Sequence, residues 1–137
     1  MSSFLIRFGC AKQHTIWLAV VMATVSQAAA LAQEPIASVR LMIDFGDGVQ
    51  KTFSALPWKD KMTVFDALRV AEKHPRGIKI TYTGSGDTTF INGIDDAVNE
   101  GADGRNWRYS VNDQPARYSS AVAEIKARDT VVWRFEK

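Results

Sequence analysis

The sequence predicts an α+β domain, a β-grasp-like mixed sheet packed by one helix, that follows a cleavable signal peptide. Three observations predict it: a hairpin pattern opens the domain, one amphipathic helix follows, and alternating strands fill the remainder. One helix cannot cover two sheet faces, so its apolar stripe should pack on one side of a mixed sheet. A small antiparallel roll or sandwich with the helix at one end is the alternative.

The first 32 residues have the order of a secretory signal peptide. A basic, acid-free start precedes the uncharged apolar run Thr15–Val25, and Ala30-Leu31-Ala32 fits the small-residue cleavage rule. A membrane anchor would need about 20 apolar residues, roughly twice the length of this run. A lipoprotein would need a cysteine after the run, whereas Cys10 precedes it.

The predicted cut before Gln33 divides the chain into a signal peptide over 1–32, a short tether over 33–38 and a domain over 39–137. Export to the periplasm or the exterior follows. Removing Arg7 and Lys12 with the signal leaves 15 basic residues against 15 acidic ones, and no cysteine remains. Zero net charge argues against a nucleic-acid partner. Stability must come from packing rather than disulfides, and no membrane span is expected in the mature chain.

The domain opens with a hairpin and a helix. Val39–Phe45 and Val49–Leu56 read as strands around a Gly-Asp-Gly turn. Thr63 precedes a run of helical spacing, and Asp66 stands where a capping box places its acid. The predicted helix, 63–73, has one apolar face formed by Val64, Ala67, Leu68 and Ala71.

The remaining chain alternates between extended runs and turns. Predicted strands cover Ile78–Thr83, Thr88–Ile91, Trp107–Val111 and Thr130–Phe135. Asn92–Asn106 is rich in Gly, Asn and Asp and is predicted to be a long loop or a set of turns, and Asn112–Pro115 a turn. Ala121–Ile125 is ambiguous between helix and extended chain.

Four stretches carry a family resemblance in their order and spacing. They are Met62–Leu68, Phe90–Asp96, Trp107–Asp113 and Ile125–Phe135. Together they resemble the transcobalamin C-terminal-like domain family, secreted bacterial modules related to the β-rich domain that closes over cobalamin in vertebrate carriers. The resemblance implies a binding role and makes cobalamin a candidate ligand. Asp113 and Arg128 depart from it, because both stand where glycine is usual.

The mature chain offers little for catalysis. It has no thiol and only one histidine, His74, in a helix-ending segment, so a nucleophilic triad is not expected. The acidic segment 95–104 lacks the spacing of an EF-hand, which favours a solvated loop over a weak calcium site. We therefore predict no catalytic residues, no metal site and no resident cofactor.

Candidate ligand-binding residues come from segments that core periodicity does not explain. Trp58 follows a proline in a polar, lysine-flanked loop, although it could equally plug the open end of the sheet. Trp107 and Trp133 alternate in phase with core positions, which favours packing over an aromatic ligand platform that would also include Trp58, Tyr109 and Tyr118. The predicted ligand site lies among the Trp58 loop, the 92–106 loop and the 112–115 turn. Its residues are Trp58, Asn92, Asp95, Asn112 and Asp113.

The sequence thus predicts an exported, non-enzymatic binding module. Its ligand would be a small molecule, corrinoid-like if the resemblance extends to function, or an extracytoplasmic partner. The alternative is a structural or accessory envelope protein that docks through a sheet edge.

Overall fold

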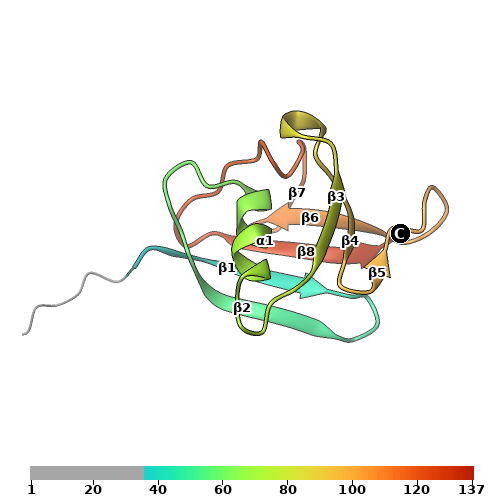
Figure 1. Cartoon of the computed structure of the whole chain (residues 1–137), viewed down its shortest axis with the longest axis horizontal. Coiled ribbons are helices and arrows are strands. Elements are labelled where there is room, and N and C mark those ends of the chain that lie inside the picture. Colours follow the sequence, from blue (N-terminus) through green and yellow to red (C-terminus); the bar gives the residue numbers. More distant parts are fainter. Residues whose placement is uncertain (1–35) are drawn as a thin grey trace, which may run out of the picture. The chain divides into compact units, whose positions relative to one another are not determined.

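A computed structural model describes residues 36–137, shown in Figure 1. The predicted signal peptide, its cleavage site and the first half of the tether lie outside these residues. Within 36–137, the helix is too short and too polar to span a bilayer.

Residues 36–137 form eight strands, one α-helix and one short 3-10 turn. Their bounds are β1 Ser38–Asp44, β2 Gln50–Pro57, α1 Val64–Glu72, β3 Ile80–Thr83, η1 Gly86–Thr88, β4 Phe90–Ile94, β5 Ala97–Val98, β6 Asn106–Val111, β7 Gln114–Pro115 and β8 Thr130–Glu136. The α+β class with a single helix is confirmed.

The larger sheet has five strands in the order β2-β1-β8-β6-β7. β1 pairs antiparallel with β2, as the hairpin pattern predicts, and parallel with β8. β6 pairs antiparallel with β8 over its whole length but with β7 only at Ser110 and Val111. The sheet is therefore mixed, with the first and last long strands side by side at its centre (Figure 1).

A second, three-stranded sheet of order β3-β4-β5 replaces the single sheet that the sequence predicts. The prediction of an irregular segment over 92–106 is wrong for its first half. There β4 continues to Ile94, and the chain then turns back to form β5. The two-residue turn between them needs a left-handed residue, and Asp95 supplies it with φ of 51°. The segment is rich in polar residues typical of turns, so its sequence pattern did not predict this hairpin.

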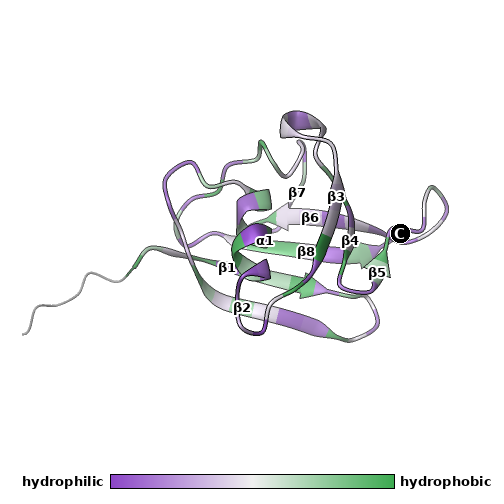
Figure 2. Cartoon of the chain, in the orientation of Figure 1, coloured by the Kyte–Doolittle hydropathy of each residue, from purple (hydrophilic) through white to green (hydrophobic). Residues whose placement is uncertain are grey.

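α1 and the small sheet cover the same face of the large sheet. α1 packs on β1 and β2 while β4 approaches β6, and a single core includes residues from all of them. The predicted helix face, formed by Val64, Ala67, Leu68 and Ala71, is buried. Figure 2 shows hydrophobic residues concentrated on β1 and β8. Burying each such large side chain contributes about 1.5–3 kcal/mol.

The start of α1 is fixed by local bonds and by a distant segment. Thr63 Oγ1 accepts from Asp66 N at 3.2 Å and Thr63 N donates to Asp66 Oδ2 at 2.9 Å, which confirms the capping box. Val64 N donates to Ala123 O at 2.9 Å. The ambiguous 121–125 segment is thus neither helix nor full strand: it makes one isolated bridge, between Glu124 and Thr63.

Candidate functional site: a groove at the edge of β6

A cavity of about 640 Å³ lies along the incomplete edge of β6. Its walls come from residues 89–91 at β4, residues 107–110 of β6, residues 132–134 and 136 of β8, and the segment around β7 from Asp113 to Ser120. The cavity touches four consecutive residues of β6, and β7 covers only Ser110 and Val111 of that strand, so the cavity reaches the open edge of β6 as well as the neighbouring β8. We call it the β4–β6 groove.

One end of the groove is closed by the side chain of Asn99. Its Nδ2 donates to Ile91 O at 2.8 Å, and its Oδ1 accepts from Trp107 N at 2.8 Å. The amide therefore joins an edge of the small sheet to an edge of the large one. It takes the place that a peptide group of an intervening strand would occupy.

The loop after β7 closes the other end. Ala116 N donates to Tyr109 O at 2.9 Å, and Ser119 Oγ donates to Thr89 O at 2.9 Å. Tyr109 Oη donates to Tyr118 O at 2.6 Å. The groove is therefore bounded at both ends by hydrogen bonds that hold β4 and β6 apart.

Two aromatic side chains of the groove lie unusually open to solvent. Phe90 is 57% exposed and Tyr118 is 72% exposed, although both are large apolar rings. Neighbouring exposed aromatics in a concave surface are typical of binding sites, because covering them releases ordered water. They come from β4 and from the loop after β7, which lie on either side of the β6 edge.

Beneath the groove lies a buried aromatic pair. The rings of Tyr109 and Trp133 are 5.1 Å apart, and Trp133 is only 3% exposed. Within residues 36–137 the indole N–H of Trp133 has no hydrogen-bond partner. An unpaired buried donor costs about 1–3 kcal/mol, so a ligand acceptor that reaches it would remove that cost.

Charged groups line the outer part of the groove. Arg108 and Arg134 stand opposite each other on β6 and β8, and Asp113 and Glu136 supply the opposite charge. Burial raises the pKa of the Tyr109 hydroxyl. This hydroxyl therefore remains protonated and donates its hydrogen bond throughout the physiological pH range.

Of the five residues predicted to bind ligand, Asp113 alone lines this groove. Asn112 and Asp113 form the two-residue turn between β6 and β7 with φ values of 48° and 65°. Asn112 has a structural role there: its Nδ2 donates to Asp129 Oδ1 at 2.8 Å and its Oδ1 accepts from Thr130 N at 2.9 Å.

Trp58 packs against the core. Its Nε1 donates to Ile125 O at 2.8 Å and its backbone N donates to Ala37 O at 2.8 Å. The ring is therefore held at the end of the sheet where β1 begins. This placement corresponds to the plug that the sequence left open as an alternative.

Asn92 lies in β4, and Asp95 lies in the turn between β4 and β5. Asp95 Oδ2 pairs with Lys51 Nζ at 2.7 Å and Oδ1 accepts from Lys79 N at 2.8 Å. Asn92 O accepts from Asn99 N at 2.8 Å. Asp95 lines a second, shallower concavity of about 560 Å³. The five predicted residues therefore do not share one surface.

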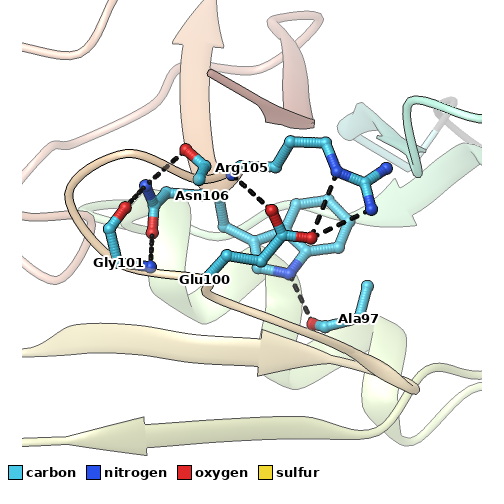
Figure 3. Close-up of polar contacts among 7 residues, drawn as sticks. Ala97, Glu100, Gly101, Arg105 and Asn106 are labelled. Carbon is cyan, nitrogen blue, oxygen red and sulfur yellow. Dashed lines mark hydrogen bonds and ion pairs between the residues drawn. The ribbon is translucent and has the colours of Figure 1, made fainter.

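The acidic loop is held in shape by an ion pair between Glu100 and Arg105 (Figure 3). Glu100 accepts from the backbone N of Arg105 at 2.8 Å and from its guanidinium at 3.0 Å. Both bonds lower the pKa of the Glu100 carboxyl, and the bond from the backbone N of Arg105 has the larger effect. Asn106 Nδ2 donates to Gly101 O at 2.7 Å, and Trp107 Nε1 donates to Ala97 O at 2.8 Å. Over residues 36–137, no three acidic, histidine or cysteine side chains are grouped to hold a metal ion.

Sequence reasoning missed the residues that shape the groove most. Phe90 and Asn99 lie in segments interpreted as a strand and a loop. Phe90 begins one of the four stretches that carry the family resemblance, but no pattern indicated a ligand contact at either residue. Tyr118 could have been found, because it and Trp58 are the two aromatics of the proposed platform outside the alternating strands, and Trp58 packs against the core. The predicted core roles of Trp107 and Trp133 agree with their burial.

Comparison with solved structures shows a shared fold. The chain is similar to a protein of Ruminococcus gnavus that is described provisionally as metal binding, with a TM-score of 0.58 and 11% sequence identity. The similarity covers 73% of this chain and 96% of that one. Among curated proteins no significant match is found.

The two turns where the family resemblance expects glycine keep glycine-like geometry. Asp113 and Arg128 both have positive φ, at 65° and 73°.

A family pattern matches residues 62–137, from the turn before α1 to the end of β8, and so includes the whole β4–β6 groove. The chain belongs to the family described as domain of unknown function DUF4430.

Proposed function

We propose that this protein is an exported, non-enzymatic binding module that holds its ligand in the β4–β6 groove. The observation that carries the proposal is the pairing of an incomplete strand edge with two exposed aromatics, Phe90 and Tyr118, around one cavity. Its volume, about 640 Å³, falls within the range of small-molecule sites.

Three further observations support the three parts of this proposal, namely export, the lack of catalysis and ligand binding. The N-terminal sequence has the order of a signal peptide, which supports export. The groove lining contains no cysteine to act as a nucleophile and no histidine to activate a serine, which favours binding over catalysis there. The fold is shared with a protein described provisionally as metal binding.

The finer identity of the ligand is also a proposal. The resemblance to the β domain of cobalamin carriers supports a corrinoid-like molecule. One domain of this size supplies only one wall of a closed corrinoid pocket, so we expect free cobalamin to bind weakly. Titration calorimetry with cobalamin tests this, and nanomolar binding would show that the single domain is sufficient.

The decisive experiment is native mass spectrometry of the protein purified from its own host. We expect a co-purifying mass with the parent chain and its loss in the Phe90→Ala/Tyr118→Ala variant. Val49→Ala is the matched control, because Val49 is 54% exposed and lies outside the groove. Retention of the mass by the double variant would place the site elsewhere. The same spectra report whether the mature chain begins at Gln33.

A second candidate function is an accessory protein that docks through a sheet edge. β2 favours it, because this eight-residue strand is the outermost of the large sheet and pairs only with β1. In that case a Ser54→Pro substitution on β2 would abolish partner capture, while the groove variant would leave it intact.

A further inference from the structure

The backbone of β6 presents alternate residues to the groove. Asn112 N donates to Thr130 O at 2.9 Å, and the register from there back along β6 has no bulge. Antiparallel pairing alternates, so Arg108 and Ser110 bond to β8 while Trp107 and Tyr109 point their N–H and C=O groups away from it. The bond from Ala116 N to Tyr109 O confirms this phase.

Those two residues offer four backbone groups, of which the outer two are already paired. Trp107 N bonds to the Asn99 side chain and Tyr109 O to Ala116 N. The inner two, Trp107 C=O and Tyr109 N–H, make no hydrogen bond within residues 36–137. An acceptor and a donor therefore stand side by side on the groove wall, with closed positions on both sides.

This pair of groups matches one residue of a parallel strand. In parallel pairing, a single residue donates its N–H to the carbonyl before its opposite number and accepts from the N–H after it. A residue opposite Arg108 would thus satisfy Trp107 C=O and Tyr109 N–H together. An antiparallel strand would need three consecutive residues to bond to the same two groups. The free stretch of the β6 edge is only about two residues, or roughly 7 Å, long.

The side chain of that residue would lie beside Arg108, because paired residues point to the same sheet face. The cross-strand neighbour of Arg108 is Arg134, so the position carries two like charges. Arg134 approaches Asp44 at 3.7 Å, whereas Arg108 forms no ion pair with any residue of 36–137. An acidic side chain at this position would offset the repulsion.

We propose that the β4–β6 groove binds a short extended peptide, one residue of which adds to β6 as a parallel partner of Arg108 and is acidic. Phe90 and Tyr118 pack on the flanking residues of the peptide. This inference rests on the proposed function and names the ligand class of the same site. Strand addition draws its affinity from main-chain hydrogen bonds and its specificity from alternate side chains.

The probes are blocked tripeptides, acetyl-Ala-Xaa-Ala-amide, with Asp, Asn or Lys at the centre. They are titrated into the ¹⁵N-labelled mature chain while amide shifts and exchange are recorded. We expect the Tyr109 amide to shift downfield and exchange more slowly, and the Asp peptide to bind at least tenfold more tightly than the Lys peptide. N-methylation of the central residue removes the donor to Trp107 C=O and should weaken binding at least tenfold.

Arg108→Gln is the matched variant. It should keep the Tyr109 response and lose the preference for Asp over Lys, because the backbone pairing does not involve the guanidinium. An unchanged preference would overturn the assignment of Arg108. A Tyr109 shift that appears on concentrating the chain without peptide would overturn the peptide as occupant in favour of a second copy.

The two proposals fail separately. If no tripeptide moves the Tyr109 amide while Phe90→Ala/Tyr118→Ala still abolishes the co-purifying mass, the peptide inference is wrong and the groove remains the binding site. If the tripeptides bind equally well to that double variant without a Tyr109 response, both the peptide inference and the groove assignment are wrong.

Discussion

The side-chain oxygen of Asn99 accepts a hydrogen bond from the backbone N–H of Trp107 at 2.8 Å, while its amide nitrogen donates to Ile91 O. One short side chain thus connects the two sheets, since β4 and β6 share no ladder. It also sets the width of the β4–β6 groove at its closed end. The width of the groove at that end therefore depends on a residue from the loop after β5.

Replacing Asn99 with alanine should destabilise the domain by about 1–3 kcal/mol, because Trp107 N–H and Ile91 C=O would both lose their partners. Chemical denaturation measures the change. Asn99→Asp keeps the acceptor for Trp107 and should lie between alanine and the parent. A loss under about 0.5 kcal/mol for alanine would show that water replaces the amide at little cost.

Leu68→Ala should cost about 2–5 kcal/mol, because Leu68 is fully buried in the face of α1 that meets the sheet. This is a large fraction of the about 5–15 kcal/mol that stabilises a typical domain. Arg69→Ala, on the exposed side of α1, is the control and should cost under about 1 kcal/mol. Equal midpoints for the two variants would contradict the assigned face.

Arg128→Gly should stabilise the protein modestly. Arg128 holds φ of 73°, and a left-handed conformation costs a residue with a Cβ about 1–2 kcal/mol. Glycine removes that strain but adds unfolded-state entropy of about 0.5–1 kcal/mol, so a net gain of up to about 1 kcal/mol is expected. Asp113→Gly should gain less, because aspartate tolerates this conformation better. Thermal melts of the two variants compare them directly.

Alkaline pH should weaken the fold through Tyr109. Burial raises its folded pKa above the unfolded value near 10, so the folded state holds the phenolic proton more tightly. Its contribution is complete below the unfolded pKa and is lost as pH rises through the folded pKa. Urea titrations from pH 8 to 11.5 should show a steeper loss for the parent than for Tyr109→Phe. Parallel curves would contradict this origin.

Trp58→Ala combined with Asn112→Ala should lower stability without abolishing ligand binding. Trp58 bonds to Ile125 O and Asn112 holds the start of β8, so both act on the scaffold. Binding is measured on the folded fraction, at a temperature well below the melting transition. A folded double variant that no longer retains the co-purifying mass would restore these residues to the ligand site.

Features that depend on neighbours along the chain could be predicted from the sequence. The capping box of Thr63 and Asp66, the apolar stripe of α1 and the β1–β2 hairpin each arise from one continuous segment, the longest being the hairpin over Ser38–Pro57. Strand alternation likewise predicted that Trp107 and Trp133 face the core. These patterns follow from the fixed periods of helix and strand, which no tertiary contact is needed to establish.

The tertiary structure alone decided which strand edges remain open. The second sheet, the parallel pairing of β1 with β8 and the meeting of Asn99 with Trp107 join residues that local rules do not relate. Trp58 shows the same limit, since a tryptophan after proline can be an anchor or a plug until its partner, Ile125, is known. The groove exists because β7 pairs with only two residues of β6. Nothing in the sequence of β6 indicates how many of its residues will pair with β7.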